Sequence, residues 1–234
     1  MKTSYVTIKA KDGSGDFRAY LSLPAANTAP AVVVIQEIFG VNRVMRDICD
    51  GLAQSGYMAI CPDLFWRQEP GIDITDKTRE EWAEAFELFK GFNVDKGVED
   101  VTATLSFARA HESNSGKAGT LGYCLGGKLA FLSAARTDTD CSVCYYGVGI
   151  DELLGEAEKI KNQFLMHIAE KDKFVPEAAR EKIMTMLGRN PKIEMYLYKD
   201  VDHAFAREGG EHWDAKAAAV ANGRTGGFLA AHLK

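Results

Sequence analysis

The chain has 234 residues, of which 46% are hydrophobic, and its formal net charge is −5. A chain of this length and composition can bury an extensive core without help, which is typical of a moderately large globular domain. The mild acidity and the absence of basic runs argue against nucleic acid or anionic membrane as a partner.

The amino-terminal segment, the apolar runs and the cysteine count indicate where the protein is found. The amino-terminal segment 1–13 is polar and lacks the apolar core of a signal peptide, and no apolar run is long enough to span a bilayer. Five cysteines, an odd number in a chain without an export signal, indicate reduced thiols rather than a disulfide framework. We therefore expect a cytoplasmic, monomeric protein with one domain over residues 1–234 and no membrane association.

After a pair of antiparallel strands, strand-like and helix-like segments alternate along the chain. Strands are expected at residues 5–10, 17–23, 31–36, 57–61, 118–123, 142–146, 164–168 and 193–198. Helices are expected at residues 43–55, 76–92, 94–111, 125–136, 177–190 and 211–232. The continuous apolar run 31–35 is typical of a strand covered on both faces. The segment 61–78 is rich in turn formers and is expected to form a lid or a pocket wall.

A thiol lies between glycines in the motif Gly122-Tyr123-Cys124-Leu125-Gly126-Gly127, after a predicted strand and before a predicted helix. Flanking glycines let the chain reverse from strand to helix within one or two residues, which lifts the apex side chain above the sheet. The unpaired N–H groups at the start of the helix favour a thiolate and a developing oxyanion. The motif indicates a nucleophile elbow, but glycine-rich turns also bind phosphates, so catalytic partners are needed to support it.

A carboxylate and a histidine follow the elbow in the order nucleophile, acid, histidine, which is the α/β-hydrolase order. Asp172 comes just after the predicted strand 164–168, and His203 just after the strand 193–198. Since open α/β sheets build their sites at the carboxyl ends of strands, we expect these side chains to converge with Cys124. We predict an α/β-hydrolase fold with a mostly parallel central sheet of about eight strands, flanked by helices and without a large cap domain.

Less specific interpretations exist for these residues taken singly. A lone cysteine is most often a core residue, and an aspartate shortly before a proline is most often a turn residue. Cys141 and Cys144 could form half of a redox or metal site, but they lie in a predicted strand and no second pair completes a zinc site. The remaining histidines are interpreted as structural or surface residues: His111, His167, His212 and His232.

Further motifs extend the pattern over nearly the whole chain. They are Gln36-Glu37-Ile38-Phe39-Gly40-Val41-Asn42, Cys61-Pro62-Asp63-Leu64, Tyr145-Tyr146-Gly147, Asp172 with Phe174-Val175-Pro176, and His203-Ala204-Phe205-Ala206-Arg207. With the elbow, they make the chain resemble the dienelactone hydrolases, α/β-hydrolases with a cysteine nucleophile. The resemblance implies a carboxymethylenebutenolidase-type enzyme that opens an unsaturated lactone bearing a carboxylate, during the degradation of chlorinated aromatic compounds. It implies a small-molecule partner, no metal and no organic cofactor.

The expected chemistry gives each residue of the site a distinct role. The Cys124 thiolate attacks the ester carbonyl, and the backbone N–H groups of Leu125 and Ile38 bind the resulting oxyanion. Collapse of this intermediate gives an acyl-enzyme. His203 activates the water that hydrolyses it, while Asp172 orients His203 and stabilises its imidazolium.

Glu37 is an additional expected catalytic residue. A carboxylate near a cysteine disfavours the thiolate unless its charge is engaged elsewhere. By resemblance, Arg207 is the partner of Glu37. The resemblance further implies that Glu37 takes part in deprotonating the thiol when the substrate carboxylate competes for Arg207.

The chain departs from the family pattern in the expected pocket. Trp82 and Phe86 stand where the best-known members carry an arginine that binds the substrate carboxylate and a tyrosine, and Ala204 replaces a serine. Aromatic rings cannot replace a planar charged fork, although Arg67 or Arg79 could supply the charge. We therefore predict a more apolar pocket. The expected substrate-binding residues are Arg207, Trp82, Phe86, Phe39 and Tyr146.

Two other functions remain open on sequence alone. A broader carboxylesterase or thioesterase could use the same machinery. A non-catalytic ligand-binding relative is disfavoured because no member of the expected triad is missing.

Overall fold

The computed structural model describes residues 1–234. The chain separates into two compact units, Met1–Thr120 and Leu121–Lys234. The boundary between them falls inside strand β5 (Asn114–Tyr123). The expectation of a single domain stays a prediction.

Eight strands form a mostly parallel sheet in the order β1-β2-β4-β3-β5-β6-β7-β8, which confirms the predicted fold class. The strands besides β5 are β1 (Lys2–Lys9), β2 (Asp16–Leu23), β3 (Ala29–Ile35), β4 (Met58–Pro62), β6 (Cys141–Tyr145), β7 (Gln163–Ala169) and β8 (Ile193–Tyr198). The helices are α1 (Arg43–Gln54), α2 (Arg79–Gly91), α3 (Val94–Ala110), α4 (Leu125–Arg136), α5 (Glu177–Leu187) and α6 (Ala215–Leu233), with short 3-10 turns η1 (Ile150–Glu152) and η2 (Leu154–Lys159). None of these helices combines the length and apolarity needed to cross a bilayer.

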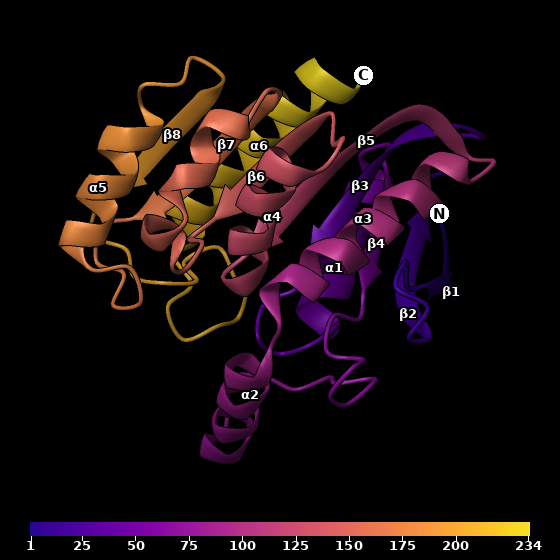
Figure 1. The fold of residues 1–234 in the computed structure, drawn as a ribbon, viewed down its shortest axis with the longest axis horizontal. Helices are drawn as coiled ribbons and strands as arrows, with labels where there is room; N and C mark the ends of the chain where they lie inside the picture. Colours follow the sequence, from indigo (N-terminus) through magenta and orange to yellow (C-terminus); the bar gives the residue numbers. More distant parts are fainter. The chain divides into compact units, whose positions relative to one another are not determined.

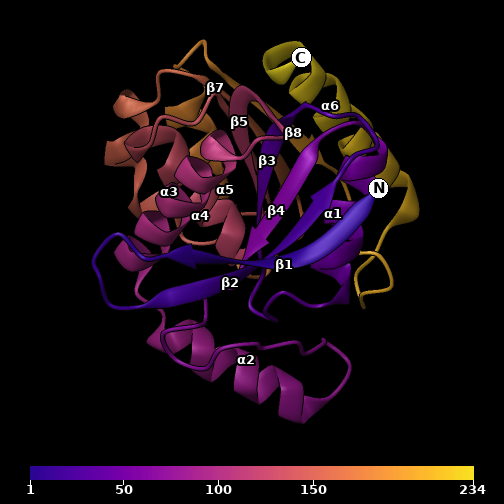
Figure 2. The same cartoon turned by 90° about the vertical axis from the view of Figure 1, so that its right-hand side faces the viewer.

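In the first unit, β3 and β4 form a parallel pair whose side chains are all buried. Helices α1 and α3 lie on opposite sides of these strands (Figure 2). Burial on both faces explains why the run 31–35 is continuously apolar rather than alternating. The predicted antiparallel pair at the amino terminus is confirmed, since β2 pairs antiparallel with β1 and also with β4.

In the second unit, β6, β7 and β8 are parallel neighbours. Helix α4 lies in front of these strands and α6 behind them in Figure 1. All side chains of β6 are buried, and only the first of β7 is partly exposed. Each fully buried large apolar side chain contributes about 1.5–3 kcal/mol, so this packing fixes the strand ends and the loops that follow them.

Helix α2 begins later than predicted, at Arg79 rather than at residue 76. The Thr78 hydroxyl accepts a hydrogen bond from the Glu81 N–H and caps the helix there. The Glu81 carboxylate in turn accepts the Thr75 N–H at 2.9 Å, which holds the preceding residues in a turn. A capping residue, not the apolar pattern, therefore fixes the start of this helix.

The last helix and the fifth strand also differ from their predicted bounds. Helix α6 begins at Ala215 rather than at residue 211, because the Asp214 carboxylate caps the first free N–H groups. Strand β5 begins at Asn114, four residues before the predicted start at 118, and its first residues are mostly exposed. A mostly exposed strand segment carries no continuous apolar signal, so its start is hard to predict.

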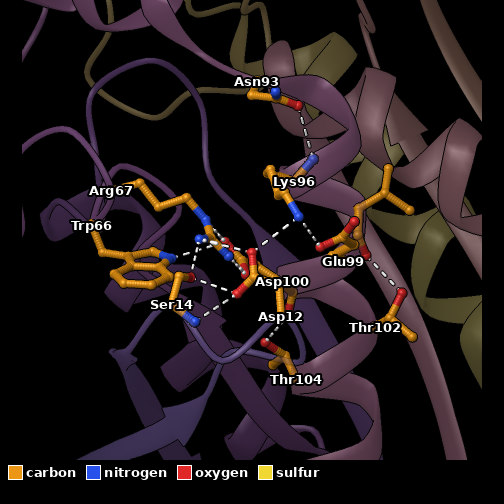
Figure 3. Close-up of polar contacts among 11 residues, drawn as sticks. Asp12, Ser14, Trp66, Arg67, Asn93, Lys96, Glu99, Asp100, Thr102 and Thr104 are labelled. Atoms are coloured by element: carbon orange, nitrogen blue, oxygen red, sulfur yellow. Dashed lines mark hydrogen bonds and ion pairs between the residues drawn. The ribbon is translucent and has the colours of Figure 1, made fainter.

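Arg67 anchors the segment after β4 to helix α3 (Figure 3). Its guanidinium forms ion pairs with Asp100 at 2.8 Å and with Asp12 at 3.2 Å. The Trp66 indole N–H donates to the same buried Asp100 carboxylate at 2.8 Å. These contacts argue against Arg67 as the missing clamp for a substrate carboxylate. The predicted role of residues 61–78 as a lid or pocket wall stays a prediction.

Candidate active site

Cys124 lies at the tip of a strained turn between β5 and α4. Its backbone has φ 54° and ψ −113°, an arrangement that costs a non-glycine residue about 1–3 kcal/mol. The preceding Gly122 has no room for a side chain, because a Cβ there would overlap the Gly126 carbonyl. Gly127 is equally close-packed, since its Cβ would lie 2.8 Å from the Cα of Gly147. The strained strand-to-helix turn expected of a nucleophile elbow is therefore present, and its glycines are needed for close approach of the backbone.

Asp172 is fixed by its own loop, just past the end of β7. One carboxylate oxygen accepts the backbone N–H groups of Phe174 at 2.8 Å and Val175 at 3.2 Å. The other oxygen is left to face His203, whose Nδ1 lies 2.8 Å away. Both side chains are buried, so water does not weaken this contact. Asp172 thus has the turn geometry expected of a lone aspartate and also the histidine partner expected of a triad acid.

His203 follows β8 and contacts both expected partners. The backbone N–H of His203 donates to Asp202 at 2.7 Å, and ring Nδ1 binds Asp172. Burial by itself lowers the pKa of His203, but the charge of Cys124, hydrogen bonds to Asp172 and Cys124, and the charge of Asp172 raise it to about 10. Because Nδ1 is occupied by Asp172, Nε2 is the ring nitrogen that is left to interact with Cys124. The raised pKa favours the protonated form of His203.

Two aromatic rings enclose the imidazole of His203. The Tyr146 ring lies 5.0 Å from it and the Phe174 ring 4.8 Å, both edge to face. Tyr146 is one of the expected substrate-binding residues, whereas Phe174 has no expected role beyond its motif. Its position two residues after Asp172 in the Phe174-Val175-Pro176 motif could have indicated this contact. The exposed fraction of Phe174 is 47%, so it covers His203 from the solvent side.

Backbone strain is concentrated in the loops of this unit. The chain has four non-glycine residues at positive φ: Cys124, Tyr146, Asp200 and Ala204. Cys124 is a candidate site residue, Tyr146 contacts His203, and Ala204 directly follows His203. Strained residues of this kind cluster at functional sites. Ala204 has φ 62°, and the next turn brings the Arg207 N–H to its carbonyl at 2.9 Å. This turn fixes the backbone of Arg207, whose side chain is buried.

The remaining expected site residues belong to the first unit. Glu37, Ile38 and Phe39 are buried on the loop after β3. Trp82 and Phe86 lie one turn apart on α2, with their rings stacked at 5.4 Å, and Trp82 packs edge to face on Phe39 at 5.0 Å. Phe39, Trp82 and Phe86 thus form one aromatic cluster. The roles of Glu37 with Arg207, and of Ile38 with Leu125, stay predictions from the sequence.

The other cysteines and the histidine in β7 have the expected structural character. Cys49, Cys61, Cys141 and Cys144 are free and buried. Burial, with a smaller contribution from the charge of Cys124, raises the pKa of Cys144 to about 12, which keeps this thiol unreactive. His167 is wholly buried and bonded through both ring nitrogens. No group of three or more histidine, cysteine, aspartate or glutamate side chains is arranged to hold a metal ion.

A parallel sheet whose successive loops carry a nucleophile elbow, an acid and a histidine is the architecture of the α/β-hydrolases. Residues 17–233 match the model of the dienelactone hydrolase family, and the chain belongs to this family.

Its relatives cover almost the entire chain. A protein of Azospirillum brasilense, provisionally named carboxymethylenebutenolidase, is 52% identical over 97% of this chain and 98% of its own. The carboxymethylenebutenolidase of Pseudomonas putida is 40% identical over 98% of this chain and 97% of its own. A crystal structure from Klebsiella pneumoniae, provisionally named dienelactone hydrolase, has a TM-score of 0.84 and 26% identity over 98% of this chain and 99% of its own. The chain is therefore a hydrolase of ester or lactone bonds.

Proposed function

We propose that the chain opens small lactones or esters by a covalent mechanism in which Cys124 is the nucleophile. The observation that carries this proposal is the continuous contact from Cys124 through His203 to Asp172. His203 binds Asp172 through Nδ1 at 2.8 Å and has its other ring nitrogen for the thiol. A nucleophile bonded to a base that is itself oriented by a third group is the general arrangement for covalent catalysis.

In the first half-reaction the Cys124 sulfur forms a bond to the carbonyl carbon, and the carbonyl oxygen becomes an oxyanion. The N–H of Leu125, at the first position of α4, is a free donor of the helix start and suits this charge. Ile38 is proposed as the second donor on sequence grounds. The bond to the leaving oxygen then breaks, and the His203 imidazolium gives that oxygen its proton.

In the second half-reaction the neutral His203 takes a proton from water, whose oxygen attacks the acyl carbon. The carbon–sulfur bond breaks and releases the acid, and the thiolate returns beside the imidazolium. Asp172 keeps Nδ1 protonated throughout and stabilises the imidazolium, so Nε2 alone exchanges protons. One water is consumed for each ester bond.

The proposed substrate is a lactone that bears a carboxylate, in line with the name carboxymethylenebutenolidase of relatives at 40% identity. Arg207 is proposed to bind this carboxylate and Glu37 to pair with Arg207 in its absence. Trp82 and Phe86 stand where an arginine and a tyrosine are expected, so we propose weaker selection for the charged substrate. A charge-assisted hydrogen bond contributes about 1.5–3 kcal/mol, roughly 10- to 100-fold in kcat/KM.

The test compares kcat/KM for a dienelactone and for its methyl ester in the wild type and in Trp82→Arg. We expect the wild type to prefer the free acid only weakly and the arginine variant to prefer it by a further 10-fold or so, because a guanidinium binds a carboxylate as a planar fork. A strong preference in the wild type that Trp82→Arg leaves unchanged would contradict the apolar-pocket proposal. Higher turnover of p-nitrophenyl esters or thioesters than of the lactone would favour the broader esterase instead.

A further inference from the structure

A chain of hydrogen-bonded side chains lies between strands β6 to β8 and helix α6 in the second unit. We call it the α6 network, and it consists of Arg224, Tyr198, His167, Thr225, Tyr145 and Asn222. Its strand members are the last residues of β6 and β8 and a residue inside β7. The exposed Arg224 and Asn222 are its two ends, while its centre is buried.

The donor-only end at Arg224 favours one direction for the bonds of the α6 network. Arg224 can only donate, and its guanidinium lies 3.1 Å from the Tyr198 hydroxyl. With the proton of the neutral imidazole on Nε2, the Tyr198 O–H donates to Nδ1 of His167 at 2.8 Å. In this tautomer the groups that follow are satisfied by bonds that run in one direction.

The second half of the α6 network continues in the same direction. The Nε2–H of His167 donates to the Thr225 hydroxyl at 2.9 Å, and that hydroxyl donates to Tyr145 at 2.7 Å. The Tyr145 O–H then donates to the amide oxygen of Asn222 at 2.9 Å. Burial first, and the charge of Arg224 second, lower the pKa of His167 to about 3, so the neutral imidazole persists at physiological pH. Thr225 is the central link, since it accepts from one strand and donates to another.

The backbone of each strand member holds one loop of the proposed active site. The carbonyl of Tyr145 accepts the Cys124 N–H at 3.1 Å, and its ring stacks on Tyr123 at 4.7 Å, directly before the nucleophile. The carbonyl of His167 accepts the N–H of Tyr146, whose ring packs on His203, at 2.8 Å. The third contact links the carbonyl of Tyr198 to Glu170, two residues before the triad acid, at 3.0 Å.

We propose that Thr225 and His167 are positioning residues that hold the Cys124, Tyr146 and Asp172 loops in catalytic register through the α6 network. The proposal rests on the proposed cysteine mechanism. Loss of the Thr225 hydroxyl leaves the buried Nε2–H of His167 unpaired and removes one of the two hydrogen bonds of the Tyr145 hydroxyl. A buried donor without a partner is costly and favours rearrangement of its surroundings. Any shift of the strand ends moves the sulfur relative to the imidazole, and catalysis is sensitive to displacements of 1 Å or less.

The variant Thr225→Val tests this, because valine keeps the shape of threonine and removes only the hydroxyl. We expect kcat to fall about 10- to 100-fold with little change in KM, and the pH dependence of Cys124 alkylation by iodoacetamide to shift. Thr225→Ser, which restores the hydroxyl, is expected to recover both. The matched control is Ser133→Ala, which removes a buried hydroxyl that has no hydrogen-bond partner.

The proposal would be overturned if Thr225→Val had the same kcat and the same alkylation profile as Ser133→Ala. If Thr225→Val does not fold, Tyr145→Phe carries the same test, because it keeps the stacked ring and removes one link of the α6 network. Unchanged kcat and alkylation in that variant would likewise overturn the proposal. Failure of the cysteine mechanism is recognised separately, by full turnover in a protein without the Cys124 sulfur.

Discussion

Alanine at position 124 is expected to reduce kcat/KM for lactone hydrolysis by at least about 10⁴-fold, because it removes the nucleophile and leaves only binding and oxyanion stabilisation. Serine at this position is also expected to lose most of the activity. The hydroxyl keeps the shape of the thiol but is far less acidic, and the proposed mechanism needs a thiolate nucleophile. Steady-state kinetics and a mass spectrum of the quenched reaction measure both effects.

The matched control for these variants is Cys141→Ala. Cys141 is buried in β6, five residues before Tyr146, and has no role in the proposed chemistry. We expect this control to retain near wild-type turnover and an acyl adduct on Cys124, whereas both Cys124 variants lose the adduct. Wild-type turnover in Cys124→Ser would place the nucleophile elsewhere.

Asp172→Asn is expected to lower kcat by roughly 10³- to 10⁴-fold while the fold is kept. The asparagine oxygen can still accept the N–H groups of Phe174 and Val175, so the loop retains its turn. The amide nitrogen then faces Nδ1 of His203 and is a donor, which reverses the hydrogen bond and places the imidazole proton on Nε2. In that tautomer His203 cannot accept a proton from water.

Asp200→Asn serves as the matched control for the loss of a carboxylate. Asp200 lies at φ 61°, a conformation that asparagine also tolerates, and its side chain pairs with Lys171 at the surface. We expect kcat within about two-fold of wild type, as for most surface substitutions. Equal losses in the two variants would show that charge in general, and not the bond to His203, supports catalysis.

The sequence was sufficient to predict the fold class and to single out Cys124, Asp172 and His203 as candidate residues, because their signals are local. Glycines on both sides of Cys124 are required by the close approach of the backbone there, and each catalytic partner directly follows an apolar strand. The order of nucleophile, acid and histidine adds a constraint that a lone motif lacks. Strongly buried strands such as β3 and β6 were predictable for a related reason, since burial leaves a continuous apolar run.

Other features depend on contacts between distant segments and leave no pattern along the chain. His167 was interpreted only as structural, and nothing in the sequence links it to Thr225, which is 58 residues away. The pairing of Arg67 with Asp100 likewise joins a loop to a helix 33 residues later. Helix starts were misplaced where a capping residue such as Asp214 overrides the apolar pattern.

The proposed mechanism requires that Cys124 and His203 form a thiolate–imidazolium pair held by Asp172. The most direct test is an NMR titration of the His203 imidazole in the wild type and in Cys124→Ala. Since negative charge at sulfur favours the protonated ring, we expect a pKa of about 10 in the wild type and a clear fall toward 6.5 when the sulfur is removed. A His203 that titrates near 6.5 in both proteins would contradict the ion pair and the mechanism built on it.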